Sequence, residues 1–332
     1  MSFVEELIPA PAPGQCLVRT LVSAISAGTE LLVYRGQWPE DTPVDDTIPS
    51  LVGAFSYPLK YGYSAVGIVV KVGAGVPPAL LGARAFCFNP HETHFLVDMD
   101  DLILIPSQVT AEDAVFLSNM ETAVGLVMDG NPLVGEAVVV FGLGVVGLLT
   151  TSVLGKFPLS VIISLDGYAV RREKSLSLGA HYSFDPNSPE TRDQLQELPA
   201  LKGPVGGPDL IYELSGNPQA LNEAILVGSF DSRIVVGSWY GSKRADLSLG
   251  TRFHRSRMRI MSSQVSRLGP SLTGRWDKKR RMDLAWKLIH SIRPSCLITH
   301  RIPFSRAGEA FELLHGSPGQ AIQVILQYED ET

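Results

Sequence analysis

The sequence has few cysteines and no strong excess of charge of one sign. Its 332 residues include three cysteines, Cys16, Cys87 and Cys296, and none of them stands in a C-x-x-C pair. This spacing excludes a disulfide framework and a zinc knuckle, and it is typical of a reducing compartment. A net charge of −6 gives no general argument for a nucleic-acid or membrane partner. Residues 1–6 have neither the basic start nor the apolar run of a signal peptide, so we expect a cytoplasmic protein.

One long apolar run is present, at residues 137–155, and a membrane span is one interpretation of it. Three internal glycines interrupt this run, and its first residues, Ala137–Phe141, have the composition of a strand. A second β run, Val161–Leu165, follows and leads to Asp166. These features favour a buried strand and the start of a helix over a membrane span.

The turn between that strand and that helix has the pattern G-x-G-x-x-G. Gly142 allows a tight turn, Gly144 lets the backbone approach a pyrophosphate, and Gly147 lets the helix pack closely on the strand. Free N–H groups at the start of the helix attract the anion. Asp166, about 20 residues further on, can accept hydrogen bonds from the adenosine ribose. We therefore predict a dinucleotide site formed by Gly142, Leu143, Gly144, Val145, Val146, Gly147 and Asp166.

The order of the predicted elements indicates an α/β fold with two domains. Strand and helix alternate after residue 137, which is typical of a doubly wound parallel sheet with helices on both faces. We expect residues 121–265 to form this Rossmann-type domain. Residues 1–120 and 266–332 are expected to form a β-rich domain around it. Because ligands bind at the carboxyl ends of parallel strands, we expect the active site in the cleft between the domains.

Four segments spread along the chain match one family pattern. They are Ser26–Glu30, Gly62–Val69, Gly142–Gly147 and Asp209–Gly216. In this combination the chain resembles the medium-chain dehydrogenase/reductase superfamily, whose members include the zinc-type alcohol dehydrogenases. The resemblance implies a GroES-like catalytic domain beside the Rossmann domain, and an NAD(P)-dependent oxidoreductase. In such enzymes the nicotinamide transfers the hydride, and the protein supplies binding, orientation and a proton path.

The chain departs from this family where the catalytic zinc would bind. The resemblance puts Ala27 at the position of a cysteine, Tyr63 at that of a histidine and Ser64 at that of a glutamate, with the later ligand near Ser118. None of these is a good zinc ligand. Residues 84–90 also lack the family's four-cysteine zinc lobe. We therefore predict a protein without zinc, with a displaced metal site as the alternative, formed by His91, His94 and Glu30.

Three further segments are similar to one branch of the superfamily. They are Tyr57–Ser64, Phe88–His94 and Phe253–Val265. They resemble the zinc-lacking branch that includes the bacteriochlorophyllide hydroxyethyl dehydrogenase-like proteins. This resemblance implies a reaction type, hydride transfer, and leaves the substrate open.

Without zinc, another group has to stabilise the charge that develops on the substrate oxygen. Thr29 matches a family position whose hydroxyl contacts that oxygen, and capping of the local backbone is its alternative role. Tyr63 replaces a metal ligand, so its phenol is expected to polarise or protonate a carbonyl, or else to fill the volume of the lost metal. His91 is the third catalytic candidate, because a histidine titrates near neutral pH. Its alternative is a surface histidine or a hydrogen-bonded loop histidine. Glu30 and Ser64 are weaker candidates.

The acid at position 166 favours NAD(H) over NADP(H), because a carboxylate binds a ribose diol and repels a 2′-phosphate. Arg171 and Arg172 weaken this preference, since arginines tolerate a phosphate, and Arg171 matches a family position near the adenosine ribose. The resemblance adds further cofactor-lining residues at Thr122, Ser215, Val236 and Gly237.

A basic segment interrupts this acidic chain at residues 252–281, where ten lysines and arginines stand against one aspartate. A solvated surface with salt bridges is one interpretation. Recognition of an anionic substrate is the second, with Arg255 and Arg267 as the residues that reach it. Nucleic-acid binding is the third, and no aromatic interleaving supports it.

Taken together, these residues predict a zinc-independent, NAD(H)-dependent oxidoreductase for a secondary alcohol or ketone. One alternative is an enone or quinone reductase, in which hydride adds to an activated C=C bond. Another is a non-catalytic NAD(H)-binding protein. The resemblance also implies a homodimer, formed through the strand around Met258–Gln264. We expect a small-molecule substrate and neither a nucleic-acid nor a membrane partner.

Overall fold

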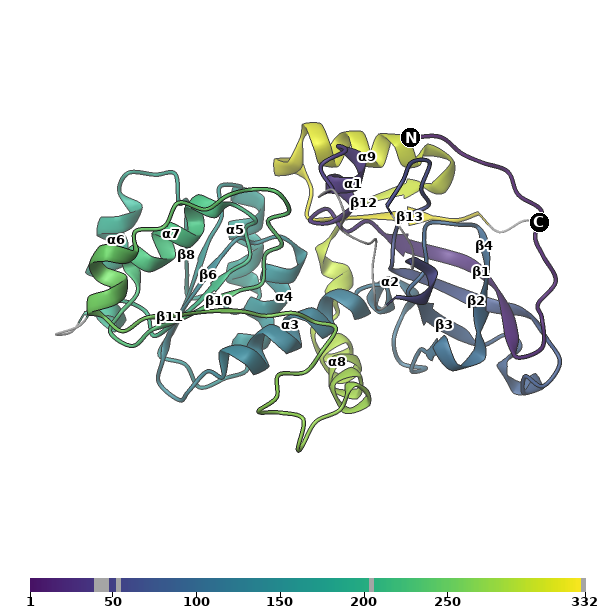
Figure 1. Cartoon of the computed structure of the whole chain (residues 1–332), viewed down its shortest axis with the longest axis horizontal. Coiled ribbons are helices and arrows are strands. Elements are labelled where there is room, and N and C mark those ends of the chain that lie inside the picture. Colours follow the sequence, from purple (N-terminus) through teal and green to yellow (C-terminus); the bar gives the residue numbers. More distant parts are fainter. Residues whose placement is uncertain (39–47, 52–54, 203–205, 330–332) are drawn as a thin grey trace. The chain divides into compact units, whose positions relative to one another are not determined.

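The computed structural model describes residues 1–38, 48–51, 55–202 and 206–329 of the chain. It divides into two compact units, which we call unit 1 and unit 2 (Figure 1). Unit 1 comprises Met1–Ser118 and Trp286–Thr332, and unit 2 comprises Asn119–Ala285. The expected boundary after residue 265 therefore lies about 20 residues before the end of unit 2. No described helix combines the length and the apolar character that crossing a membrane requires.

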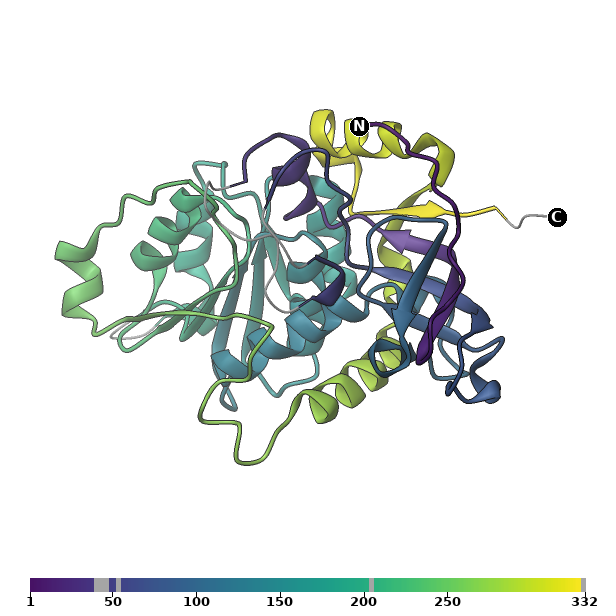
Figure 2. The same ribbon diagram turned by 45° about the vertical axis from the view of Figure 1, so that its right-hand side comes forward.

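Unit 1 is built on a seven-stranded sheet. Its strands run in the order β12-β13-β1-β2-β3-β5, and β4 also pairs with β1. The bounds are β1 (Gln15–Ala24), β2 (Ala65–Val72), β3 (Arg84–Cys87), β4 (His94–Asp98), β5 (Ile103–Leu104), β12 (Ile298–Pro303) and β13 (Gln323–Gln327). The C-terminal strand β13, yellow in Figure 2, pairs antiparallel with the purple β1. The tail of the chain thus completes the first sheet, as its strand-like sequence predicts.

Short helices cover part of the unit 1 sheet. Helix α9 (Ala307–Gly316) buries Ala307, Ala310, Phe311 and Leu314, which pack with Val324 and Leu326 of β13 and with Leu31 of α1 (Glu30–Tyr34). This cluster fixes α1 beside β13 through apolar burial, which is the main stabilising term in such packing. A further short helix among the described residues of this unit is α2 (Ala111–Ala114). Single 3₁₀ turns lie at Pro49–Leu51, Pro78–Leu80, Met99–Asp101, Pro294–Leu297, Phe304–Arg306 and Pro318–Gln320.

Unit 2 is a doubly wound parallel sheet of six strands in the order β11-β10-β9-β6-β7-β8 (Figure 1). The strands are β6 (Ala137–Phe141), β7 (Val161–Leu165), β8 (Tyr182–Phe184), β9 (Leu210–Glu213), β10 (Arg233–Val236) and β11 (Arg259–Ser262). The helices are α3 (Leu117–Gly130), which starts at the end of unit 1, α4 (Val145–Leu154), α5 (Ala169–Ser177), α6 (Thr191–Glu197), α7 (Pro218–Val227) and α8 (Lys278–Ile292), which continues into unit 1. A 3₁₀ turn at Pro199–Leu201 and an irregular turn at Leu249–Phe253 complete it. The predicted α/β class and the predicted alternation of strand and helix are confirmed.

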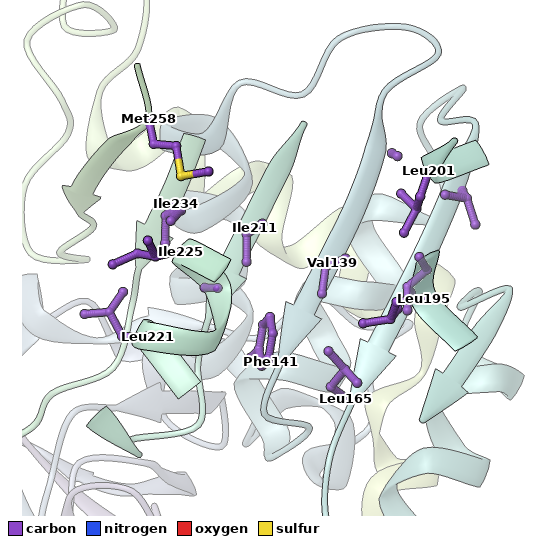
Figure 3. Packing of buried hydrophobic residues seen from close by; sticks show 14 residues of the cluster. Val139, Phe141, Leu165, Leu195, Leu201, Ile211, Leu221, Ile225, Ile234 and Met258 are labelled. Carbon is purple, nitrogen blue, oxygen red and sulfur yellow. The ribbon is translucent and has the colours of Figure 1, made fainter. Parts of the chain in front are cut away.

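The centre of unit 2 is apolar because its strands are covered on both faces. Every residue of β6 and β7 is buried. Val139 and Phe141 of β6 pack with Ile211, Ile234 and the α7 residue Ile225 in one cluster (Figure 3). This packing aligns the carboxyl ends of four strands at one edge of the sheet, since Phe141 is in register with Leu165 and Glu213, and Glu213 with Val236.

Candidate functional site

The G-x-G-x-x-G turn joins β6 to α4 at the carboxyl edge of the unit 2 sheet. Gly142 has φ +88°, a left-handed conformation that favours glycine. A Cβ on Gly147 would lie 1.9 Å from the Gly142 carbonyl oxygen, so only glycine lets the helix approach so closely. A Cβ on Gly144, by contrast, would meet no atom of the described residues within 4 Å. Gly144 therefore leaves open space at the N-terminus of α4, which is the place a pyrophosphate takes in such a turn. The residues present fit a dinucleotide.

Asp166 is linked directly to this turn. Its side chain is 8% exposed, and its two oxygens accept from the backbone N–H groups of Leu143 and Tyr168, each at 2.8 Å. A guanidinium nitrogen of Arg171 lies 3.8 Å from the carboxylate, with the cation over the Tyr168 ring. Arg172 donates to the backbone carbonyl oxygen of Asp166 at 2.8 Å and to the Asp185 carboxylate at 3.3 Å. Both arginines are thus held beside Asp166, and Arg171 is the one that pairs with its carboxylate.

A carboxylate that the sequence reasoning missed lies at the same edge. Glu213, the last residue of β9, is fully buried and accepts from the backbone N–H and hydroxyl of Ser215 and from the hydroxyl of Tyr240. Burial and this hydrogen bond raise the pKa of Tyr240. The sequence feature that could have identified Glu213 is a charged residue at the end of an apolar strand. Glu213 contacts three of the predicted cofactor residues. Ser215 donates to its carboxylate, the backbone N–H of Gly237 donates to its carbonyl oxygen, and Val236 stands opposite it in the strand pairing. Thr122 lies on α3.

Two of the predicted catalytic hydroxyls come together in unit 1. The Tyr63 hydroxyl donates to Ser26 Oγ and lies 3.4 Å from Thr29 Oγ1. Thr29 is the residue directly before α1, and its side chain makes no cap hydrogen bond to that helix. The capping role considered for Thr29 is therefore not seen at α1. Ser26 was not predicted, because its link to Tyr63 joins residues 37 positions apart.

His91 lies in a buried polar network behind these hydroxyls. Its Nε2 is 2.8 Å from Glu30 Oε2, and its Nδ1 is 2.7 Å from Ser23 Oγ. The side chains of His91 and Glu30 are 5% and 2% exposed. Ser23 Oγ in turn lies 2.9 Å from the Tyr328 hydroxyl. Burial raises the pKa of Tyr328, and the Glu30 charge adds to this. Both nitrogens of the predicted catalytic histidine are thus engaged within unit 1.

The side chains that the resemblance places at the family's metal position are poor zinc ligands. Ala27 offers no ligand atom, and the Ser64 hydroxyl donates to the Val115 carbonyl oxygen, with Ser118 Oγ 3.4 Å away. Within the described ranges, no three or more His, Cys, Asp or Glu side chains are grouped so that they could hold a metal ion. The alternative set of His91, His94 and Glu30 is therefore not assembled. His94 lies on β4, opposite Arg19, with its ring 3.4 Å from Thr93 Oγ1.

Much of the basic segment has internal contacts. Arg281 is 2% exposed and donates to the Glu121 carboxylate at 2.7 Å and to the Val265 carbonyl at 2.6 Å. Arg252 donates to the carbonyl oxygens of Gly206 and Gly228, and Arg259 pairs with Asp231. The two arginines predicted to bind substrate, Arg255 and Arg267, are exposed in unit 2.

Comparison with known proteins supports the same family. No protein-family model matches the chain. The chain is 25% identical to D-guloside 3-dehydrogenase of Escherichia coli K12 over 325 residues, covering 92% of this chain and 91% of the relative. It is 26% identical to L-threonine 3-dehydrogenase of Pyrococcus furiosus over 364 residues, covering 97% and 94%. The crystal structure of the alcohol dehydrogenase RspB of Escherichia coli CFT073 with NADH has the same fold, with a TM-score of 0.76, 22% identity and coverage of 98% and 95%.

These similarities extend over both units, so the fold combines a GroES-like unit with a Rossmann-type unit. Both of these curated relatives, which match along nearly the whole chain, are dehydrogenases. The dinucleotide turn described above is the part of the chain that such enzymes need for their cofactor. The chain is accordingly similar along nearly its whole length to dehydrogenases, and this similarity supports an NAD(P)-dependent, alcohol dehydrogenase-like oxidoreductase of the medium-chain, zinc-type superfamily.

Proposed function

We propose that this protein transfers hydride between NAD(H) and a secondary alcohol or ketone without zinc. One observation carries the proposal: Tyr63 stands at the position of a metal ligand, and its hydroxyl lies 3.4 Å from that of Thr29. Two hydroxyl groups at this spacing can both donate to one substrate oxygen. Such donors supply the electrostatic stabilisation that a metal ion supplies elsewhere.

Zinc independence is supported by the chemistry of the side chains. An alanine, a phenol and a hydroxyl that already donates to a carbonyl replace the thiolate, imidazole and carboxylate that zinc prefers. We propose on the same ground that the chain stands with the zinc-lacking branch that its local patterns resemble.

The nicotinamide, when bound, supplies or accepts the hydride. During ketone reduction, the Tyr63 hydroxyl exchanges its acceptor Ser26 for the substrate oxygen, and Thr29 donates to the same oxygen. The negative charge that develops on that oxygen is then held by two O–H groups, and Tyr63 can pass its proton to the alkoxide. Alcohol oxidation follows the reverse path. Ser26 keeps the phenol oriented in the absence of substrate.

The relatives favour a secondary alcohol over an enone. Two of them are named for dehydrogenation at position 3, one of a guloside and one of L-threonine, and both positions carry secondary alcohols. We infer the same reaction class for this chain and leave the enone or quinone reductase and the non-catalytic NAD(H)-binding protein as outcomes of the test.

We propose NAD(H) as the preferred cofactor, because the buried Asp166 is anchored to the turn by two backbone N–H groups. A carboxylate held in this way can accept from a ribose diol and repels a 2′-phosphate. Arg171 reduces this repulsion without removing it, since it is 3.8 Å from the acid.

We further propose an anionic group on the substrate, bound by Arg255 and Arg267. Both are exposed in unit 2, whereas Arg252, Arg259 and Arg281 have internal partners. If this is right, Arg255→Ala and Arg267→Ala raise the KM of the substrate and leave the affinity for NADH unchanged. An unchanged substrate KM in both variants contradicts it.

A homodimer through Met258–Gln264 is proposed from the place of β11 in the sheet. This strand pairs with β10 on one side and ends the sheet order on the other, so an edge is available for a second copy. Light scattering of the purified protein tests this, with Ile260→Pro as the variant that removes a strand N–H at this edge. A monomeric mass for the parent protein contradicts the dimer.

The first experiment combines metal analysis with a substrate panel. We expect less than about a tenth of an equivalent of zinc per chain after purification without chelator. We also expect NAD⁺-dependent oxidation of secondary alcohols that survives dialysis against a chelator. Tyr63→Phe and Thr29→Ala are expected to lower kcat, whereas Tyr182→Phe, an exposed tyrosine of unit 2, serves as the control. One full equivalent of zinc overturns the proposal, and turnover of enones alone, or NADH binding without any turnover, favours the respective alternative.

A further inference from the structure

We propose that Glu30 and His91 form a buried positioning pair that holds the Tyr63–Thr29 hydroxyls in their working geometry. This inference rests on the proposed function and assigns His91 a role through other residues rather than contact with substrate. The pair is joined by the 2.8 Å contact between His91 Nε2 and Glu30 Oε2.

Glu30 connects the pair to the turn that carries the hydroxyls. Its second carboxylate oxygen, Oε1, accepts from the backbone N–H of Ser26 at 2.8 Å. The Ser26 carbonyl accepts from the N–H groups of Thr29 and Glu30, which closes the turn. Ser26 Oγ accepts a hydrogen bond from the Tyr63 hydroxyl and so orients the phenol. The Glu30 carboxylate therefore fixes the position of the residue that orients Tyr63.

The donor and acceptor roles around His91 follow from its partners. An ionised carboxylate only accepts, so the His91 proton toward Glu30 resides on Nε2. In the neutral ring Nδ1 then accepts from the Ser23 hydroxyl, which lies 2.7 Å away. Ser23 Oγ can accept in turn from Tyr328, 2.9 Å away. The chain from Tyr328 to Glu30 is thus fully satisfied, and no ring nitrogen of His91 is left to contact a substrate.

His91 also contacts the backbone of the two residues that precede Tyr63. A Cβ on Gly62 would lie 2.9 Å from Cδ2 and Nε2 of the imidazole, and Gly62 has φ +127°. The backbone N–H of His91 donates to the Tyr61 carbonyl at 3.4 Å. The two residues that precede Tyr63 are therefore held by His91, and the Ser26 turn is held by Glu30. Two independent connections lead from the pair to the phenol.

Burial makes this arrangement sensitive to single changes. With 5% and 2% of their side chains exposed, His91 and Glu30 cannot turn to water for replacement hydrogen bonds. Removal of one partner leaves the other unsatisfied, and the strain is relieved by movement of the turn. A shift of about 1 Å in a catalytic group lowers rates by roughly 100-fold.

The test compares His91→Phe, His91→Gln and Glu30→Gln with His94→Gln as the matched control three residues away. We expect His91→Phe and Glu30→Gln to lower kcat by about tenfold or more, with the dissociation constant of NADH, measured by fluorescence, unchanged. His91→Gln is expected to recover part of the loss, because its amide can donate to Glu30 as Nε2 does. His94→Gln is expected to retain the parent kcat.

A double-variant cycle separates positioning from general stability. If the pair acts through the phenol, His91→Phe adds little to the loss already caused by Tyr63→Phe, whereas independent effects multiply. Should His91→Phe fail to fold, the same cycle is measured with His91→Gln. Parent kcat in His91→Gln and Glu30→Gln, or multiplicative losses in the cycle, overturns the positioning pair. A Tyr63→Phe variant with the parent kcat overturns the proposed function instead, so the two failures are distinguishable.

Discussion

The Cα of Gly147 lies so close to the carbonyl oxygen of Gly142 that a Cβ would come within 1.9 Å of it. Gly144, two residues after Gly142, faces open space and has φ −63° and ψ −177°, which any residue can adopt. The same turn thus contains two glycines that the fold requires, Gly142 and Gly147, and one that it does not, Gly144. We attribute Gly144 to the cofactor.

Gly144→Ala should therefore separate binding from folding. The added methyl group takes space that the pyrophosphate needs, so we expect the affinity for NADH to fall by about tenfold or more. Thermal unfolding should stay at the parent temperature or rise slightly, because alanine reduces the entropy of the unfolded chain. Gly147→Ala is the matched contrast, with an expected loss of about 3 kcal/mol of unfolding free energy. Unchanged NADH affinity in Gly144→Ala contradicts our assignment.

Asp166→Asn should change the choice of cofactor. The substitution keeps the size of the side chain and removes the charge that repels a 2′-phosphate. With Arg171 3.8 Å away, the site then becomes net positive. We expect the ratio of kcat/KM for NADP⁺ to that for NAD⁺ to rise by about tenfold or more. Asp193→Asn, an exposed acid on α6, controls for net charge, and an unchanged ratio in Asp166→Asn contradicts the NAD(H) preference.

Cys87 should make the fold less stable at alkaline pH. Burial, with smaller contributions from Cys16 and Asp101, raises the pKa of its thiol to about 12. The unfolded thiol loses its proton above about pH 8.5, whereas the folded one keeps it, so the unfolding free energy falls as the pH rises between these values. This loss amounts to roughly 2 kcal/mol between pH 7 and pH 10. Urea unfolding should show a smaller loss over this range in Cys87→Val, and equal losses in both proteins contradict the assignment.

Local determinants explain what the sequence could predict. The turn at Gly142–Gly147 and its acid at 166 are specified by residues within one βαβ unit, and the structure has them as expected. Such local patterns could not predict the hydrogen-bond partners of the candidate side chains. The His91–Glu30 and Ser23–Tyr328 contacts join residues 61 and 305 positions apart, and only the pairing of β1 with β13 brings the latter together. For the same reason, the sequence identified His91 as a candidate but could not show that both of its ring nitrogens have hydrogen-bond partners.

The extent of unit 2 shows the same limit. The sequence predicts residues 266–285 to belong to the other domain, because they follow the last predicted strand of the parallel sheet. Arg281, however, reaches back over 160 positions to Glu121 on α3, and the two side chains are 2% and 4% exposed. Helical spacing places Arg281 on the buried face of α8 with Ala285 and Ile289, but the sequence does not show which residue of α3 it meets.

The buried Arg281–Glu121 pair should tolerate joint replacement of both residues better than the loss of one partner. Arg281→Met removes the cation and leaves the Glu121 carboxylate buried without it, so we expect a loss of about 3 to 5 kcal/mol in unfolding free energy. Arg281→Met combined with Glu121→Leu replaces the pair by apolar side chains and should recover most of this loss, because no buried charge is left alone. Lys279→Met, which breaks the exposed pair with Asp283 on the same helix, should change stability by less than about 1 kcal/mol. If the double variant is as unstable as Arg281→Met, the arginine stabilises the unit through its 2.6 Å bond to the Val265 carbonyl rather than through the acid.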